Sequence, residues 1–161
     1  MRNVSGMRVV LAVFVLVLAV FTVPLLAQDK PADDMQIVRE KVKADKKLFV
    51  SEGMGLTESE AKAFWPVYDA YQADLGKLFD RSVKLIEDYA KNYQTMSNET
   101  AKKLVDEMVA IEGSRQNLRT SYLPKFRKAL PEKKVARYYQ LENKVHAVVA
   151  YELATKIPLV K

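Results

Sequence analysis

Few side chains in this sequence could carry out covalent or metal chemistry. There is one histidine, His146, and no cysteine, so neither a histidine-rich zinc site nor a thiol nucleophile can form. His146 lies in an apolar stretch, one helical turn from Val149, which is more typical of a structural histidine than of a triad base. The sequence has no glycine-rich phosphate loop and no calcium-loop spacing of carboxylates. We therefore expect no catalytic residue, no cofactor and no metal, and predict that the protein is not an enzyme.

Basic side chains are concentrated between Arg119 and Arg137. Seven of them occur in these 19 positions, against one acid, Glu132. Two interpretations are open: a solvated face around a helix turn, or an electrostatic patch that attracts acidic or unfolded chains. Tyr122 lies among these cations, and tyrosine contacts both apolar and polar surfaces. The candidate binding residues are Arg119, Tyr122, Lys125, Arg127, Lys128, Lys133, Lys134 and Arg137.

Aromatic side chains form a second concentration, upstream of the basic one. They are Phe64, Trp65, Tyr68, Tyr71, Phe79, Tyr89 and Tyr93. One interpretation makes them the core of the domain. The other makes some of them the lining of a concave face for client proteins, because tyrosine combines an apolar ring with a polar hydroxyl.

Four segments with helical periodicity must position these side chains. We predict a helix from Met35 that stops at Gly53 and Gly55, followed by helices over 57–93, 97–130 and 132–154. The second begins with a capping box, in which Thr57 is the N-cap and Glu60 follows three residues later. Proline is expected to bend the second helix at position 66 and the third at position 124. The inward stripe predicted for the third helix is Leu104, Met108, Ile111, Leu118, Tyr122 and Phe126.

The predicted fold is all-α, with about four helices, two of them long and bent, in an elongated or cradle-like open bundle. No segment alternates with the period of two that a strand requires. A chain of this size cannot bury such long helices on all sides. We therefore expect a homodimer as one way to cover the remaining apolar surface.

The N-terminal 27 residues have the pattern of a secretory signal. Arg2 and Arg8 precede the uncharged run Val9–Ala27. This run of 19 residues is close to the ~20 that span a bilayer, so two outcomes are open: cleavage after Ala27, or retention as a membrane anchor. Both place the remainder outside the cytoplasm, in the periplasm or otherwise exported, where nucleic acid is not an expected partner. Residues 28–34 are predicted to be a disordered linker, and 35–161 the helical domain.

Two five-residue segments carry a family resemblance. Leu56-Thr57-Glu58-Ser59-Glu60 resembles the LTxxQ motif that opens a helix in the Spy and CpxP group of periplasmic proteins. Leu130-Pro131-Glu132-Lys133-Lys134 is similar to the second, degenerate copy near their last helix. The matching residues are Leu56, Thr57, Glu60 and Leu130, and the glutamine of the motif is replaced by Glu60 in one copy and Lys134 in the other.

The resemblance covers roughly residues 35–153. It implies an ATP-independent periplasmic chaperone, or an envelope-stress accessory protein, whose concave side is apolar and basic. The expected partners are then unfolded or envelope proteins. Two alternatives remain: a regulatory partner of a membrane sensor protein that uses the same basic surface, and a structural helical protein anchored in the membrane.

Overall fold

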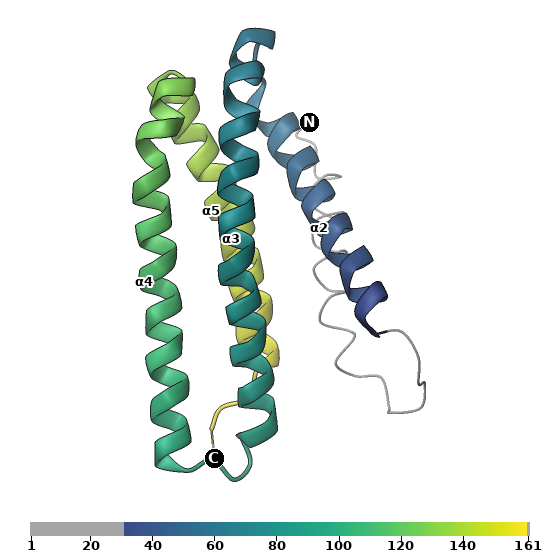
Figure 1. The fold of residues 1–161 in the computed structure, drawn as a ribbon, viewed down its shortest axis with the longest axis vertical. Helices are drawn as coiled ribbons and strands as arrows, with labels where there is room; N and C mark the ends of the chain where they lie inside the picture. The colour runs from purple at the N-terminus through teal and green to yellow at the C-terminus, as the bar shows by residue number, and fades with distance from the viewer. Residues whose placement is uncertain (1–30, 161) are drawn as a thin grey trace. The chain divides into compact units, whose positions relative to one another are not determined.

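The computed structural model describes the backbone of residues 31–160 and the side chains of 41–160. These residues form four helices and no strand (Figure 1), which confirms the predicted all-α class. The helices are α2 (Pro31–Met54), α3 (Glu58–Asn92), α4 (Asn98–Ala129) and α5 (Glu132–Lys156). The predicted signal and the first residues of the predicted linker lie outside the described part of the chain.

The boundaries of α2 differ from expectation at one end only. The helix begins at Pro31, so residues 31–34, which were predicted to be linker, belong to it. Proline suits a first helical turn because its missing N–H would have no intrahelical partner there. The helix ends at Met54, and Gly55 follows with a φ of 54°. This left-handed conformation explains why a glycine stops the helix at this point.

The caps predicted for the two long helices are confirmed. Thr57 Oγ1 accepts from the backbone N–H of Glu60, and the Glu60 carboxylate accepts from the backbone N–H of Thr57, which completes the capping box. Ser97 caps α4 in the same way, through the backbone N–H of Thr100. The helices continue without interruption through Pro66 and Pro124.

The described residues divide into two compact units. Unit 1 comprises 31–55 and 136–157, and unit 2 comprises 56–135 and 158–160. Helix α5 begins in unit 2 and enters unit 1 after its first turn. All the residues of the aromatic concentration therefore belong to unit 2.

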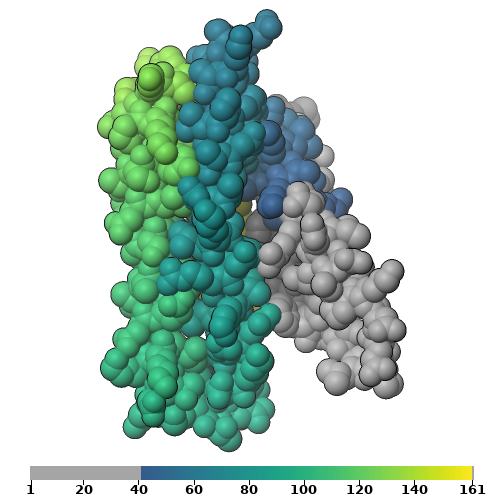
Figure 2. All heavy atoms as spheres, in the orientation of Figure 1, coloured from purple at the N-terminus to yellow at the C-terminus, as the bar shows by residue number. Residues whose placement is uncertain are grey.

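Unit 2 is an antiparallel pair of α3 and α4, joined at one end by the loop that follows Tyr93 (Figure 1). Side chains of the two helices meet over most of their length (Figure 2). Close to the N-terminus of α3 the contact is aromatic. Tyr71 lies 5.3 Å from Tyr122 and 5.8 Å from Phe126, measured between ring centroids, and Phe64 lies 5.9 Å from Phe126. These four side chains are buried, which confirms their interpretation as core.

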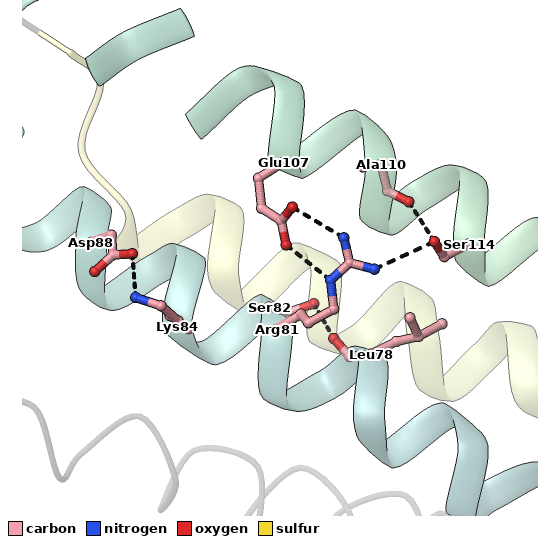
Figure 3. Close-up of polar contacts among 8 residues, drawn as sticks. All are labelled: Leu78, Arg81, Ser82, Lys84, Asp88, Glu107, Ala110 and Ser114. Atoms are coloured by element: carbon pink, nitrogen blue, oxygen red, sulfur yellow. Dashed lines mark hydrogen bonds and ion pairs between the residues drawn. The ribbon is translucent and has the colours of Figure 1, made fainter. Parts of the chain in front are cut away.

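Further along the pair a polar clamp replaces the aromatic contact (Figure 3). The Arg81 guanidinium donates to both carboxylate oxygens of Glu107, at 2.9 and 3.0 Å, and also reaches Ser114 Oγ at 3.5 Å. The Ser114 hydroxyl in turn donates to the carbonyl of Ala110. Because the pair is half exposed, it contributes modestly to stability. Its paired geometry does fix which turn of α3 faces which turn of α4.

The inward stripe predicted for α4 is wrong at one position. Ile111 is buried, but Met108 is 50% exposed. Val105 and Val109, which are 53% and 60% exposed, lie beside it on the same face of the helix. The apolar pattern of α4 therefore has two rows, and only one of them faces α3.

In unit 1, α2 and α5 run in opposite directions past each other. Lys46 and Glu142 form an ion pair of 2.9 Å with both side chains largely buried. One end of α2 approaches α5 closely: a Cβ added at Gly53 would lie 2.8 Å from two carbons of Leu141. The guanidinium of Arg137 donates to the carbonyl of Gly53. A glycine is required here by the close approach of the two helices.

Candidate functional site at the turn between α4 and α5

The chain reverses sharply between α4 and α5, and this places cations from two helices at one corner of unit 2. Leu130 has extended backbone angles (φ −140°, ψ 151°), as expected for a residue before proline. The carbonyl of Pro131 then accepts from the N–H groups of Lys134 and Val135, at 2.8 and 3.0 Å. The last turn of α4 and the first turn of α5 are thus adjacent. The basic residues of these two turns, together with Lys125 just before the last turn of α4, form what we call the junction cluster: Lys125, Arg127, Lys128, Lys133 and Lys134.

Two members of the junction cluster have carboxylate partners. Arg127 Nε lies 2.9 Å from Glu132 Oε1 across the turn, and Lys134 Nζ lies 3.7 Å from Glu60 Oε2. The first pair is well exposed, so water and salt weaken it. Glu132, the only acid of the basic stretch, is therefore held by one arginine and neutralises a small part of the cluster.

Lys128 and Lys133 are exposed, and in the described part of the chain neither has an ion pair. Lys128 also lies in the last turn of α4, where a cation is favoured by the helix dipole. The helix dipole is a sufficient reason for a cation at this position. It does not require the ammonium group to contact a particular carboxylate. These two lysines are therefore the exposed cations of the junction cluster that have neither a carboxylate nor a ring contact among the described residues.

Lys125 is tied to a buried network between α3 and α4. Its Nζ lies 3.9 Å from the centroid of the Tyr122 ring, a cation–π contact. Tyr122 is only 6% exposed, and its hydroxyl donates to Asp74 at 2.7 Å. This hydrogen bond, together with burial, raises the pKa of Tyr122 above its ordinary value. The pKa of Asp74 is lowered, first by the hydrogen bond from Lys77 and then by that from Tyr122.

The structure does not bring all eight candidate residues together. Tyr122 is part of the core of unit 2, so its ring is not a free binding surface. Arg137 belongs to unit 1 and contacts the end of α2. Arg119 is half-buried and lies more than two turns before Arg127 on α4. The remaining five residues are the junction cluster.

The two motif copies meet at their fifth positions. Glu60 and Lys134, which stand where the family motif has glutamine, form the 3.7 Å ion pair already described. The pKa of Glu60 is lowered, chiefly by its hydrogen bond with the Thr57 backbone and further by the charge of Lys134. Leu130, the first residue of the second copy, is buried. The starts of α3 and α5 are therefore joined by a pair of opposite charges.

The exposed apolar row on α4 is a surface that the sequence analysis did not identify. Val105 and Val109 are four residues apart, as core residues of a helix also are, so spacing alone did not separate them from the inward stripe. The feature that could have revealed this surface is the presence of two apolar rows on α4. Within unit 2 this helix packs along α3, which covers only one of the two rows. This row lies well away from the junction cluster along α4.

The described residues contain no group of three His, Cys, Asp or Glu side chains that could hold a metal ion. None of the helices in residues 31–160 combines the length and the apolar character that crossing a membrane requires. His146 is exposed on α5. Comparison with protein-family models, with curated proteins and with solved structures found no match.

Proposed function

We propose that this chain is an exported helical binding protein that holds unfolded or envelope proteins without ATP, as members of the Spy and CpxP group do. The observation that carries the proposal is the junction cluster. Five cations from two helices share one corner, and Lys128 and Lys133 are exposed without an ion pair in the described chain. Such a surface attracts acidic segments over a distance and accelerates their capture.

The meeting of the two motif copies supports the family assignment. In the family motif both fifth positions are glutamine, and here they are Glu60 and Lys134, whose charges are opposite and in contact. The two residues that differ from the glutamine of the motif are thus complementary in charge. The signal-like N-terminal segment supports the exported location. Outside the cytoplasm the protein would work without ATP. Because the chain has no cysteine, its fold would not depend on disulfide bonds there.

The proposal is tested by client capture. Chemically denatured client protein is diluted into buffer without ATP, with or without the full chain, and light scattering reports aggregation. Lys128→Glu combined with Lys133→Glu should lower the association rate with the client. Added salt should narrow the difference between variant and wild type, since charges are screened over about 8 Å at physiological ionic strength. The fold should survive, because surface charge changes usually alter stability by about 0.5 kcal/mol or less.

A matched control changes the net charge equally at the other end of α3. Lys84→Glu combined with Lys91→Glu removes two exposed lysines that both lie near Asp88. This control should leave the association rate nearly unchanged. Equal rates for wild type and both double variants, at low and high salt, would refute a role for the junction cluster. Co-purification of one membrane protein, with no suppression of aggregation, would instead favour the role of a sensor's regulatory partner.

A further inference from the structure

The chain returns to unit 2 after α5. Helix α5 ends at Lys156, and a last helical hydrogen bond runs from the N–H of Ile157 to the carbonyl of Leu153 at 2.9 Å. Pro158 has no N–H and cannot extend the helix. Residues 158–160 are accordingly neither helix nor strand (Figure 1). They belong to unit 2, although residues 136–157 belong to unit 1. We call residues 158–160 the return segment.

The return segment is held at the end of α3 through its backbone. The Tyr89 hydroxyl donates to the carbonyl of Pro158 at 2.5 Å, 69 positions away in the chain. The apolar side chains of the segment remain in water, since Leu159 is 89% exposed and Val160 is 51% exposed. A single exposed hydrogen bond is a weak hold, because water competes for both of its groups. The segment can therefore be displaced.

Two tyrosines form the surface on which the return segment lies. Tyr89 and Tyr93 are one helical turn apart, and their rings stack with a centroid separation of 6.2 Å and an interplanar angle of 20°. Both side chains are half-buried. The Tyr93 hydroxyl accepts from the side-chain amide of Gln94 at 3.0 Å, and its own proton has no acceptor among the side chains and backbone described for residues 41–160. We call Tyr89 and Tyr93 the tyrosine pair.

We propose that the tyrosine pair is a binding site for extended, proline-containing segments of other proteins, and that the return segment occupies it as an internal competitor. Aromatic side chains are a recurring surface for such segments. Proline has a fixed φ and keeps the preceding residue extended, so little entropy is lost on docking. The 6.2 Å between the ring centroids matches two residues of a polyproline II segment, at about 3.1 Å per residue. The pair can thus cover a dipeptide.

The return segment leaves part of this site unused. Tyr89 donates to it, whereas the proton of Tyr93 remains available for a second carbonyl. A segment of another protein that offers this carbonyl, and lays its apolar side chains on the rings, has more contacts to gain than the one hydrogen bond that it displaces. The site lies at the other end of the α3–α4 pair from the junction cluster. The proposal therefore does not rest on the function proposed above.

Peptide binding with and without the return segment tests the proposal. The probe is a fluorescein-labelled peptide that copies residues 156–160, and fluorescence anisotropy gives its dissociation constant. Deletion of residues 158–161 should tighten binding at least about twofold, because a site whose own segment is docked in most molecules is open in fewer than half of them. The deletion leaves α5 complete, and circular dichroism checks the helix content. Pro158→Gly in the full chain should also tighten binding, since it keeps the carbonyl but loosens the segment.

The role of the hydroxyl is tested in the deletion chain. Tyr89→Phe should weaken peptide binding about five- to tenfold, through the loss of one hydrogen bond. Tyr151→Phe is the matched control, because it removes the same hydroxyl from a side chain that is 69% exposed on α5, and it should have no effect. A probe carrying Pro158→Ala should bind more weakly than the original, since it is less ordered in solution.

Four outcomes would overturn the proposal. Equal peptide binding by the wild type and the deletion chain would show that the return segment does not compete. Binding that is unchanged by Tyr89→Phe would mean that the peptide binds elsewhere. A deletion chain with a lower melting temperature and no affinity for the peptide would make the return segment a structural brace of unit 2. A proline-free probe that binds as tightly as the original would remove proline from the recognition.

Discussion

Replacing Phe126 by alanine should destabilise unit 2 strongly. Phe126 is fully buried, and its ring lies 5.9 Å from that of Phe64 and 5.8 Å from that of Tyr71. Removing a buried phenylalanine forfeits its transfer free energy and leaves a cavity, together about 3–5 kcal/mol. This is a large part of the ~5–15 kcal/mol that stabilises a typical domain. With a urea m-value of about 2 kcal/mol/M, the unfolding midpoint should fall by roughly 2 M.

Phe79→Ala is the matched control for this change. It makes the same substitution on the helix that Phe126 packs against, but the Phe79 side chain is 37% exposed. Less apolar area is lost and water fills part of the gap, so the expected cost is roughly 1 kcal/mol. The difference between the two variants isolates the contribution of the aromatic core.

The assay can be made specific to unit 2. The chain has one tryptophan, Trp65, whose ring lies 5.0 Å from Phe64 and 5.3 Å from Tyr68. Its fluorescence therefore reports loss of this core, and circular dichroism reports loss of helix as a whole. A cost for Phe126→Ala below about 1 kcal/mol, or equal to that of Phe79→Ala, would refute the assignment of Phe126 to a closely packed core.

Two other predictions concern acid and glycine. The pKa values of Asp74 and Glu107 are lowered in the folded chain, so the unfolded chain takes up protons at higher pH, and stability is lost as the pH falls below about 4.5. Melting temperatures measured between pH 7 and pH 3 should show this loss. Glu107→Gln should reduce the slope of melting temperature against pH. An unchanged slope would show that the Arg81–Glu107 pair is not formed in solution. Gly76→Ala, with open space around it, should stabilise by about 0.5–1 kcal/mol in urea unfolding. Gly53→Ala should destabilise the fold, because the new Cβ would press on the buried side chain of Leu141. If Gly53→Ala and Gly76→Ala changed the stability equally, the close approach of α2 and α5 at Gly53 would be contradicted.

Local signals allowed most of the fold to be predicted. The caps at Thr57 and Ser97, and the break at Pro131, depend on residues within one helical turn, and all three are found where the sequence places them. The start of α2 could not be predicted as well, because Pro31 suits a loop and a first helical turn equally. Local chemistry alone does not decide between the two.

Tertiary contacts explain what the sequence could not reveal about the candidate site. The density of cations near the α4–α5 turn is visible in the sequence, but their partners are not. Lys134 forms an ion pair with Glu60, 74 positions away in the chain, and the Tyr122 hydroxyl donates a hydrogen bond to Asp74. Met108 was assigned to the core because α4 has two apolar rows, and periodicity does not tell which row the chain itself covers.

The division of the chain has a consequence for the order of folding. Unit 2 is built almost entirely from one continuous stretch, 56–135, whereas unit 1 joins 31–55 to 136–157. The α3–α4 hairpin can thus form as soon as its own residues are available, with short-range contacts and a small loop-closure cost. Unit 1 must wait for residues on the far side of that stretch. A hairpin already formed brings 55 and 136 closer together and reduces the entropy lost when α2 and α5 meet. We expect the hairpin to be the nucleus, so Phe126→Ala should slow refolding, whereas changes at Lys46 or Glu142 should mainly speed unfolding.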